Sequence, residues 1–226
     1  MADRERVVAL TDVDDTLLDN DRVTADLRAH LDATFGVPLR ERYFEIFEQI
    51  REDEGFADYL GALQRYRLTN LHDPRVLEMS SWLVDYPFAE RVLPGALDAV
   101  RRLERLGTTA ILSDGDAVFQ PRKIVRSGLW DAVAGNVLIY VHKEEQLAYV
   151  ERRFPAERYV VLDDKLRILT VIKQAWAERV TTVFVRQGHY ALDPDIVGAY
   201  PAADVTVDAI ADVAALTDRD LGRLAR

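Results

Sequence analysis

The chain has 226 residues, of which 49% are hydrophobic and 30% are charged, with 11 Gly and 8 Pro. This composition is typical of a globular protein with one domain, or a core domain with an insert, and it excludes disordered and collagen-like classes. The net charge of −10 argues against a nucleic-acid partner, and the absence of Cys excludes disulfides, thiolate catalysis and Cys-based zinc sites.

The N-terminal residues 1–6 are charged and lead into only a short apolar run. This pattern is not that of a signal peptide or a membrane span. We therefore expect a cytoplasmic protein without a membrane partner, present as a monomer or a homodimer.

Short apolar runs rich in β-branched residues predict buried strands at 7–13, 108–113, 136–141, 159–163 and 181–185, with an edge strand at 204–207 before a C-terminal helix. Helical patterns lie between them. One follows residues 94–96 and is expected to end at Gly107, and another follows Asp164. The alternation predicts an α/β fold, a Rossmann-like core of three layers with a parallel sheet.

Residues 17–90 interrupt this alternation with four consecutive helical patterns, at about 24–35, 39–51, 56–66 and 74–84. They predict an inserted helical bundle. The expected domains are an α/β core formed by 1–16 and 91–226, and a helical domain formed by 17–90.

Acidic side chains follow two of the predicted strands. Asp12 and Asp14 end the first strand, and Asp163 and Asp164 end the fourth. Because the ligand crevice of an open parallel sheet lies at the carboxyl ends of its strands, we expect these acids to meet there.

Groups suited to an anion follow two other strands. Ser113 and Asp114 precede a Gly-containing turn, and Lys143 follows the third strand. The four carboxylates and the single lysine would give the site a net negative charge, which would repel a phosphate. A divalent cation with oxygen ligands is therefore expected, and we predict Mg²⁺.

These segments resemble the motifs of the haloacid dehalogenase (HAD) superfamily with a helical (C1-type) cap. Residues 12–16 match Asp-x-Asp-x-Thr, Ser113 matches the Ser or Thr of the second motif, Lys143 the third-motif Lys, and 163–164 the acidic pair. The resemblance extends over the whole chain, and the predicted bundle falls where the family has its cap.

The resemblance implies a phosphatase mechanism with Asp12 as nucleophile and Asp14 as general acid and base. It also implies that Ser113 and the backbone N–H of Asp114 hold the phosphoryl group, with Lys143 as its countercharge.

The implied metal ligands are the Asp12 carboxylate, the Asp14 backbone carbonyl and one acid of the pair. Asp164 is the first choice for that acid, with Asp163 acting through water or a hydrogen bond.

Three positions depart from the family pattern. Asp15 stands where Gly is frequent, and Asp114 where Asn is frequent, so Asp114 either selects against highly anionic substrates or engages only its backbone. Glu144 follows Lys143 where Pro is frequent. Lys123 competes with Lys143 for the lysine role, although it falls within the helix predicted after Ser113.

Residues 186–190 follow the fifth strand on the crevice side. We expect Arg186 or His189 to contact the substrate or the cap, the alternative being an ordinary surface loop. The remaining histidines, His30, His72 and His142, are expected to be solvated.

The expected activity is a Mg²⁺-dependent phosphatase acting on a small phosphorylated metabolite through an aspartyl-phosphate. A phosphomutase or phosphotransferase is the alternative within the superfamily. A 2-haloacid dehalogenase is less favoured, because that branch lacks both the metal and the second Asp of the first motif. In this chain the second Asp is present as Asp14. A non-catalytic binding module is disfavoured by the intact motifs.

Overall fold

The computed structural model describes residues 7–222, and within this range the six strands form one parallel sheet in the order β3-β2-β1-β4-β5-β6. The strands are β1 (Val7–Thr11), β2 (Thr108–Asp114), β3 (Val137–Tyr140), β4 (Arg158–Asp163), β5 (Val180–Val185) and β6 (Val205–Val207). All six were predicted, and the parallel α/β architecture is confirmed.

Helices cover both faces of the sheet, so the core has three layers. On β1, Ala9 packs in the apolar cluster that contains Val100 of α5 (Ala96–Glu104), whereas Leu10 packs in the opposite cluster, with Leu169 of α9 (Leu166–Trp176). This alternation is the strand period of two. The core helices are α5 (Ala96–Glu104), α6 (Phe119–Arg126), α7 (Leu129–Ala132), α8 (Leu147–Arg153), α9 (Leu166–Trp176), α10 (Gly188–Leu192) and α11 (Pro194–Gly198).

Short 3₁₀ helices complete the core: η1 (Phe88–Arg91), η2 (Lys143–Glu145), η3 (Ala177–Arg179) and η4 (Ile210–Ala215). The last of these stands where a C-terminal helix was expected.

Gly107 does not end α5 as predicted. The helix stops at Glu104, and a Cβ placed on Gly107 would lie 2.0 Å from the carbonyl oxygen of Val7. The position requires Gly because β1 passes against it, which the helical pattern alone does not reveal.

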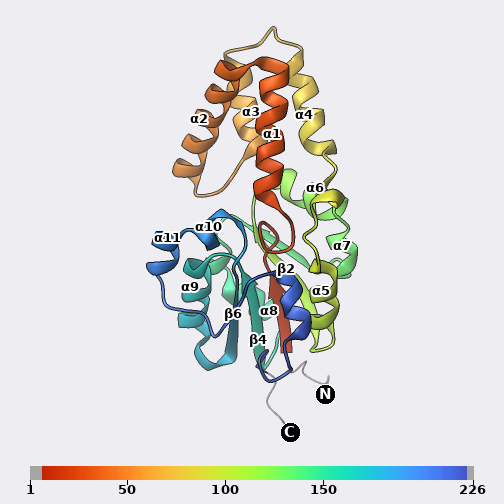
Figure 1. The fold of residues 1–226 in the computed structure, drawn as a ribbon, viewed down its shortest axis with the longest axis vertical. Helices are drawn as coiled ribbons and strands as arrows, with labels where there is room; N and C mark the ends of the chain where they lie inside the picture. Colours follow the sequence, from red (N-terminus) through yellow and green to blue (C-terminus); the bar gives the residue numbers. More distant parts are fainter. Residues whose placement is uncertain (1–6, 223–226) are drawn as a thin grey trace.

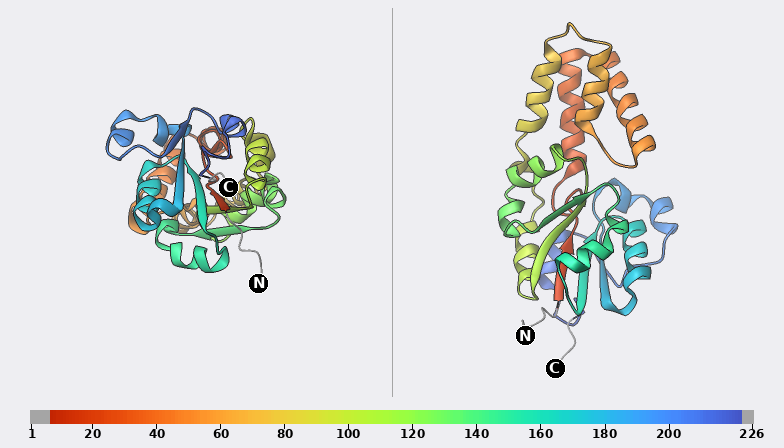
Figure 2. Two further views of the ribbon diagram at one scale, coloured as in Figure 1. Left: turned by 90° about the horizontal axis from the view of Figure 1, so that it is seen from below. Right: turned by 180° about the vertical axis from the view of Figure 1, so that it is seen from behind.

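Four helices lie between β1 and β2 in the chain: α1 (Asn20–Phe35), α2 (Val37–Glu54), α3 (Tyr59–Leu68) and α4 (Arg75–Asp85). Figures 1 and 2 show them as a bundle beyond the carboxyl ends of the strands. We call α1–α4 the helical insert. No helix within residues 7–222 is long and apolar enough to cross a membrane.

Capping side chains explain where two of these helices begin. The Asp19 carboxylate accepts from the backbone N–H of Arg22, and α1 starts four residues before the expected Thr24. The Asp58 side chain accepts from the N–H of Gly61, so α3 starts at Tyr59 and not at Phe56.

A chain of aromatic rings joins the insert to the sheet domain. The ring centroids of Phe47 and Tyr59 are 4.6 Å apart, those of Tyr59 and Phe119 are 5.1 Å apart, and those of Phe119 and Phe88 are 5.6 Å apart. These rings therefore pack between domains as well as within the insert.

The two connections between insert and core pair with each other. Leu18 forms an antiparallel bridge with Val92. The N–H of Leu93 donates to the carbonyl of Leu17 at 2.9 Å, and the N–H of Asp19 donates to that of Arg91 at 2.8 Å. The insert thus leaves and re-enters the core through one short two-stranded ribbon.

Candidate active site

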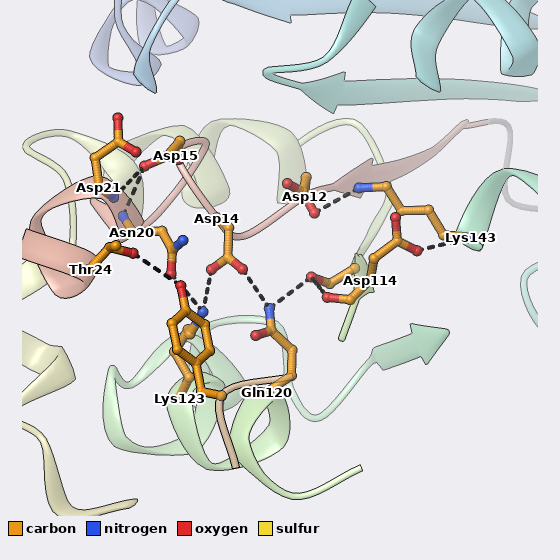
Figure 3. A network of polar contacts seen from close by, with 12 residues as sticks. Asp12, Asp14, Asp15, Asn20, Asp21, Thr24, Asp114, Gln120, Lys123 and Lys143 are labelled. Atoms are coloured by element: carbon orange, nitrogen blue, oxygen red, sulfur yellow. Dashed lines mark hydrogen bonds and ion pairs between the residues drawn. The ribbon is translucent and has the colours of Figure 1, made fainter. Parts of the chain in front are cut away.

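Asp12 lies at the carboxyl end of the central strand, with its side chain buried. The Lys143 ammonium, in η2 beyond β3, donates to Asp12 Oδ1 at 2.7 Å (Figure 3). Burial alone would raise the pKa of Asp12, but the charges of Lys143 and Lys165 outweigh it, and the pKa lies below its ordinary value. The side chain is therefore held as a carboxylate.

The acidic pair after β4 has two different environments. Asp163 Oδ1 accepts from the N–H of Lys165 at 2.9 Å, and its Oδ2 lies 2.7 Å from Lys143 Nζ, an ion pair not aligned as a hydrogen bond. Asp164 is 1% exposed, and neither of its carboxylate oxygens has a hydrogen-bond partner among residues 7–222. Burial raises the pKa of Asp164 well above its ordinary value.

Asp12, Asp163 and Asp164 each offer a carboxylate oxygen, and these oxygens lie within 4.8 Å of one another. Unsatisfied buried oxygens are costly, and a cation would satisfy those of Asp164. The all-oxygen donor set suits a hard divalent ion. This acidic cluster could therefore hold a metal ion, and Asp164 is its available member.

Asp14 is held by side chains from α6. Lys123 Nζ lies 2.7 Å from Asp14 Oδ1 and also donates to Asn20 at 2.9 Å, and Gln120 Nε2 lies 3.4 Å from Asp14 Oδ2 (Figure 3). The two competing lysines thus both reach the site, Lys143 at Asp12 and Lys123 at Asp14.

Ser113 and Asp114 end β2 beside these groups. The Ser113 hydroxyl accepts from Gln120 Nε2 at 2.9 Å, and Asp114 Oδ1 accepts from the N–H of Lys143 at 2.8 Å. The Asp114 side chain therefore fixes the loop that carries Lys143, while burial raises its pKa to about 6.

Sequence reasoning missed two residues of the site. Lys165 follows the acidic pair directly, so the strand-end rule that selected Lys143 could also have found it. Gln120 carried no such signal, because its contact depends on how α6 is oriented. With three lysines facing four carboxylates, the charge excess from which Mg²⁺ was predicted is largely compensated, and the unpartnered Asp164 oxygens become the stronger argument for a metal.

Asp15 anchors the first helix of the insert. Its φ is 56°, and its Oδ1 accepts from the N–H groups of Asn20 at 2.9 Å and Asp21 at 3.0 Å. Burial and the nearby Asp21 charge raise the pKa of Asp15 to about 7. A Cβ on Gly188 would lie 2.4 Å from that of Asp15, so Gly is required there.

The loop after β5 contacts the insert through His189 and Tyr190. His189 Nδ1 lies 2.5 Å from Asp21 Oδ1, its N–H donates to Asp21 Oδ2 at 2.8 Å, and the Tyr190 hydroxyl accepts from Arg51 at 2.7 Å. Arg186 is not brought to the site; it is 52% exposed and pairs with Asp208.

Two of the three remaining histidines are not solvated as expected. His30 is half-buried and stacks on Trp82 with ring centroids 4.5 Å apart. The His142 ring lies against Gly55, where a Cβ would meet it at 2.5 Å. His72 is exposed, in agreement with the prediction.

A cavity of about 620 Å³ opens between the insert and the carboxyl ends of the strands. Asp14, Asp114, Gln120, Lys123 and Asp164 line its floor, and the insert contributes much of its aromatic wall. The volume is that of a small-molecule site.

Neither a protein-family model nor a curated protein matches the sequence. A solved structure from Burkholderia xenovorans, described as a haloacid dehalogenase-like hydrolase, is 60% identical over 94% of this chain and 99% of its own, with a TM-score of 0.90. A HAD-hydrolase from Bacillus subtilis bound to magnesium is 16% identical over 93% and 97%, with a TM-score of 0.59. L-2-haloacid dehalogenase from Xanthobacter autotrophicus is 19% identical over 92% and 96%, with a TM-score of 0.60.

Proposed function

The chain belongs to the haloacid dehalogenase-like hydrolases, and from this we propose that it is a Mg²⁺-dependent phosphatase acting on a small phosphorylated metabolite through an aspartyl-phosphate at Asp12. The observation that carries the proposal is the pairing of two aspartates with two separate lysines, Asp12 with Lys143 and Asp14 with Lys123, each at 2.7 Å. Asp12 can then act as the nucleophile toward phosphorus while Asp14 acts as the general acid and base.

In the first step an Asp12 carboxylate oxygen attacks phosphorus, and the bond from phosphorus to the ester oxygen breaks. Asp14 gives its proton to the departing alkoxide, so the alcohol leaves neutral. Lys143 holds the Asp12 carboxylate in place, with Nζ 2.7 Å from Oδ1.

In the second step Asp14 takes a proton from water, whose oxygen attacks the phosphorus of the aspartyl-phosphate. The bond between phosphorus and the Asp12 oxygen breaks, which releases phosphate and restores both carboxyl groups. We propose that the Ser113 hydroxyl, which accepts from Gln120, donates to the phosphoryl oxygens.

The Asp12 and Asp164 carboxylates and the Asp14 backbone carbonyl would hold Mg²⁺. Asp163 is engaged by Lys143 and by the N–H of Lys165, and we propose that it acts on this ligand set through these contacts and not as a direct ligand. Bound Mg²⁺ supplies positive charge that stabilises the phosphoryl group in the transition state. We further propose that the helical insert acts as the cap and excludes bulk water during the first step.

A panel of phosphorylated metabolites assayed with and without Mg²⁺, on wild type and Asp12→Asn, tests the proposal. We expect turnover that requires Mg²⁺ and is lost in the variant. Metal-independent turnover, or full activity of Asp12→Asn, contradicts the mechanism. Release of halide from a 2-haloacid, with no hydrolysis of any phosphate, assigns the chain to the dehalogenase reaction instead.

A further inference from the structure

Lys165 differs from the other two lysines of the site. Lys143 and Lys123 each lie 2.7 Å from a carboxylate oxygen. Lys165 Nζ, in contrast, has no hydrogen bond and no carboxylate within ion-pair distance among residues 7–222. An ammonium has three donors, and leaving them without acceptors in a half-buried position is unfavourable.

The acid next to Lys165 in the chain does not pair with it. Asp164 precedes Lys165 in the chain and has two buried oxygens without hydrogen-bond partners, yet the two side chains form no ion pair. The two neighbouring side chains therefore lack different partners. The Asp164 oxygens lack a hydrogen-bond donor or a cation at the acidic cluster, and the Lys165 ammonium lacks an acceptor in the cavity that it lines.

Tyr190 supports the Lys165 ammonium from one side. Lys165 Nζ lies 4.9 Å from the centroid of the Tyr190 ring, and the Tyr190 hydroxyl accepts from Arg51 of the insert at 2.7 Å. The aromatic face stabilises the cation without neutralising it. Tyr190 is thus a positioning residue, and the hydrogen-bond donors of the Lys165 ammonium stay available for a ligand.

The remaining lining of the cavity indicates the chemical character of the substrate skeleton between Lys165 and the reacting phosphorus. The cavity also contains Asp14 and Gln120, and one part of its wall is aromatic, formed by Phe44, Phe47, Phe56, Tyr59 and Phe119. An apolar carbon skeleton fits such a wall, with the phosphate at one end and a second anionic group at the other.

We propose that Lys165 recognises a carboxylate on the substrate, so that the enzyme selects phosphate monoesters of hydroxycarboxylic acids with an apolar skeleton. The assignment rests on the proposed phosphatase function. A carboxylate is favoured over a second phosphate because the ammonium is one compact charge beside the acidic cluster, where a dianion would be more strongly repelled.

Benzyl phosphate and its 4-carboxy derivative test the assignment, since they differ only in a carboxylate remote from phosphorus and have similar leaving groups. With saturating Mg²⁺ we expect wild type to prefer the carboxylated ester by about tenfold in kcat/KM, the size of one charged hydrogen bond. Lys165→Met removes the preference, whereas Lys165→Arg, which keeps the charge, retains part of it.

Arg28→Gln is the matched control. Arg28 lines the same cavity, lies 3.7 Å from the Phe44 ring centroid and has no ion pair within the described chain, so it is the other unpaired cation of that wall. We expect this variant to keep the wild-type preference. A preference lost in Arg28→Gln and kept in Lys165→Met overturns the assignment.

The remaining outcomes separate this inference from the proposed function. Equal rates of wild type on both esters, or an equal loss on both in Lys165→Met, overturn the role of Lys165 and leave the phosphatase intact. The absence of a preference in wild type overturns the role of Lys165 even where a variant does not fold. No hydrolysis of any phosphate ester overturns the proposed function and this inference with it.

Discussion

Two clusters at the edge of the sheet each bring together three side chains that could hold a metal ion, at similar spacing. Asp12, Asp163 and Asp164 form one, and Asp15, Asp21 and His189 form the other; in each, the potential ligand atoms lie within 4.8 Å of one another. All three residues of the first cluster are buried, whereas His189 is exposed and Asp21 half-buried in the second.

The clusters differ in whether their oxygens already have partners. Both Asp21 oxygens are engaged by His189, and Asp15 Oδ1 accepts from two backbone N–H groups of α1. Asp164 has two buried oxygens with no hydrogen bond within residues 7–222. The second cluster is therefore a satisfied clamp between domains, and unsatisfied oxygens distinguish a metal site better than closeness of acids does.

Removing the Lys143 ammonium, which pairs with two acids of the first cluster, should have the largest effect on the free energy of unfolding. Lys143→Met leaves Asp12 and Asp163 as buried charges without their shared partner, and we expect a loss of about 3 to 5 kcal/mol in the free energy of unfolding. Urea unfolding at constant Mg²⁺ measures it. A loss below about 1 kcal/mol would mean that the cluster is not held by this ion pair.

Asp164→Asn should abolish metal binding at the first cluster. We expect phosphatase kcat/KM to fall by at least about a hundredfold, since the variant removes one charged ligand of the proposed metal site. In wild type, Mg²⁺ at a hundred times its Kd should raise the free energy of unfolding by about 2.7 kcal/mol, an effect that EDTA reverses and the variant lacks.

Asp21→Asn is the matched control for that experiment, because the same substitution is made in the second cluster. Magnesium protection in Asp21→Asn should equal that of wild type. Protection lost in Asp21→Asn and kept in Asp164→Asn would reverse the assignment of the two clusters.

Asp114, beside the first cluster, should give stability a pH dependence in the metal-free protein. Burial raises its pKa from 3.8 to about 6 in the folded state, so its contribution is complete below the unfolded pKa and is lost as pH rises through about 6. Between pH 4 and 7, wild type in EDTA should lose about 2 kcal/mol more unfolding free energy than Asp114→Asn. Parallel pH profiles for the two proteins would contradict the shift.

The smallest effect is expected at the clamp. His189→Ala removes a contact between an exposed imidazole and the half-buried Asp21, and we expect a loss of less than about 1 kcal/mol in the free energy of unfolding. Tyr190→Phe, which removes only the hydroxyl that Arg51 contacts, should behave similarly. A loss above about 2 kcal/mol in either variant would show that the clamp is a main stabilising contact between insert and core.

The strand-end residues of the site were predictable because parallel strands bring their carboxyl ends to one edge. Asp12 directly follows β1, and Ser113 and Asp163 lie at the carboxyl ends of β2 and β4, which are the neighbours of β1 in the sheet. Lys165 was within reach of the same rule, since it follows Asp163 by two residues.

Contacts that depend on the angle of a helix were not predictable. Lys123 was noted as a competitor, but its pairing with Asp14 requires α6 to present one face to β1. Likewise, the contact of His189 with Asp21 joins residues of two domains, and Gly107 was misinterpreted because its reason lies in the Val7 backbone. Such contacts arise from tertiary packing and leave no periodic pattern in the sequence.

The paired ribbon between insert and core has a consequence for protein engineering. Leu18 and Val92 are bridged partners. If the segment between them, which carries the helical insert, were removed, the two ends left in the sheet domain would already lie within a strand spacing of each other. A two-residue hairpin turn could join them and close the chain of the sheet domain without stretching it. The insert is therefore a replaceable module: helical bundles of different sequence could be grafted at this single junction while the strand ends keep their chemistry.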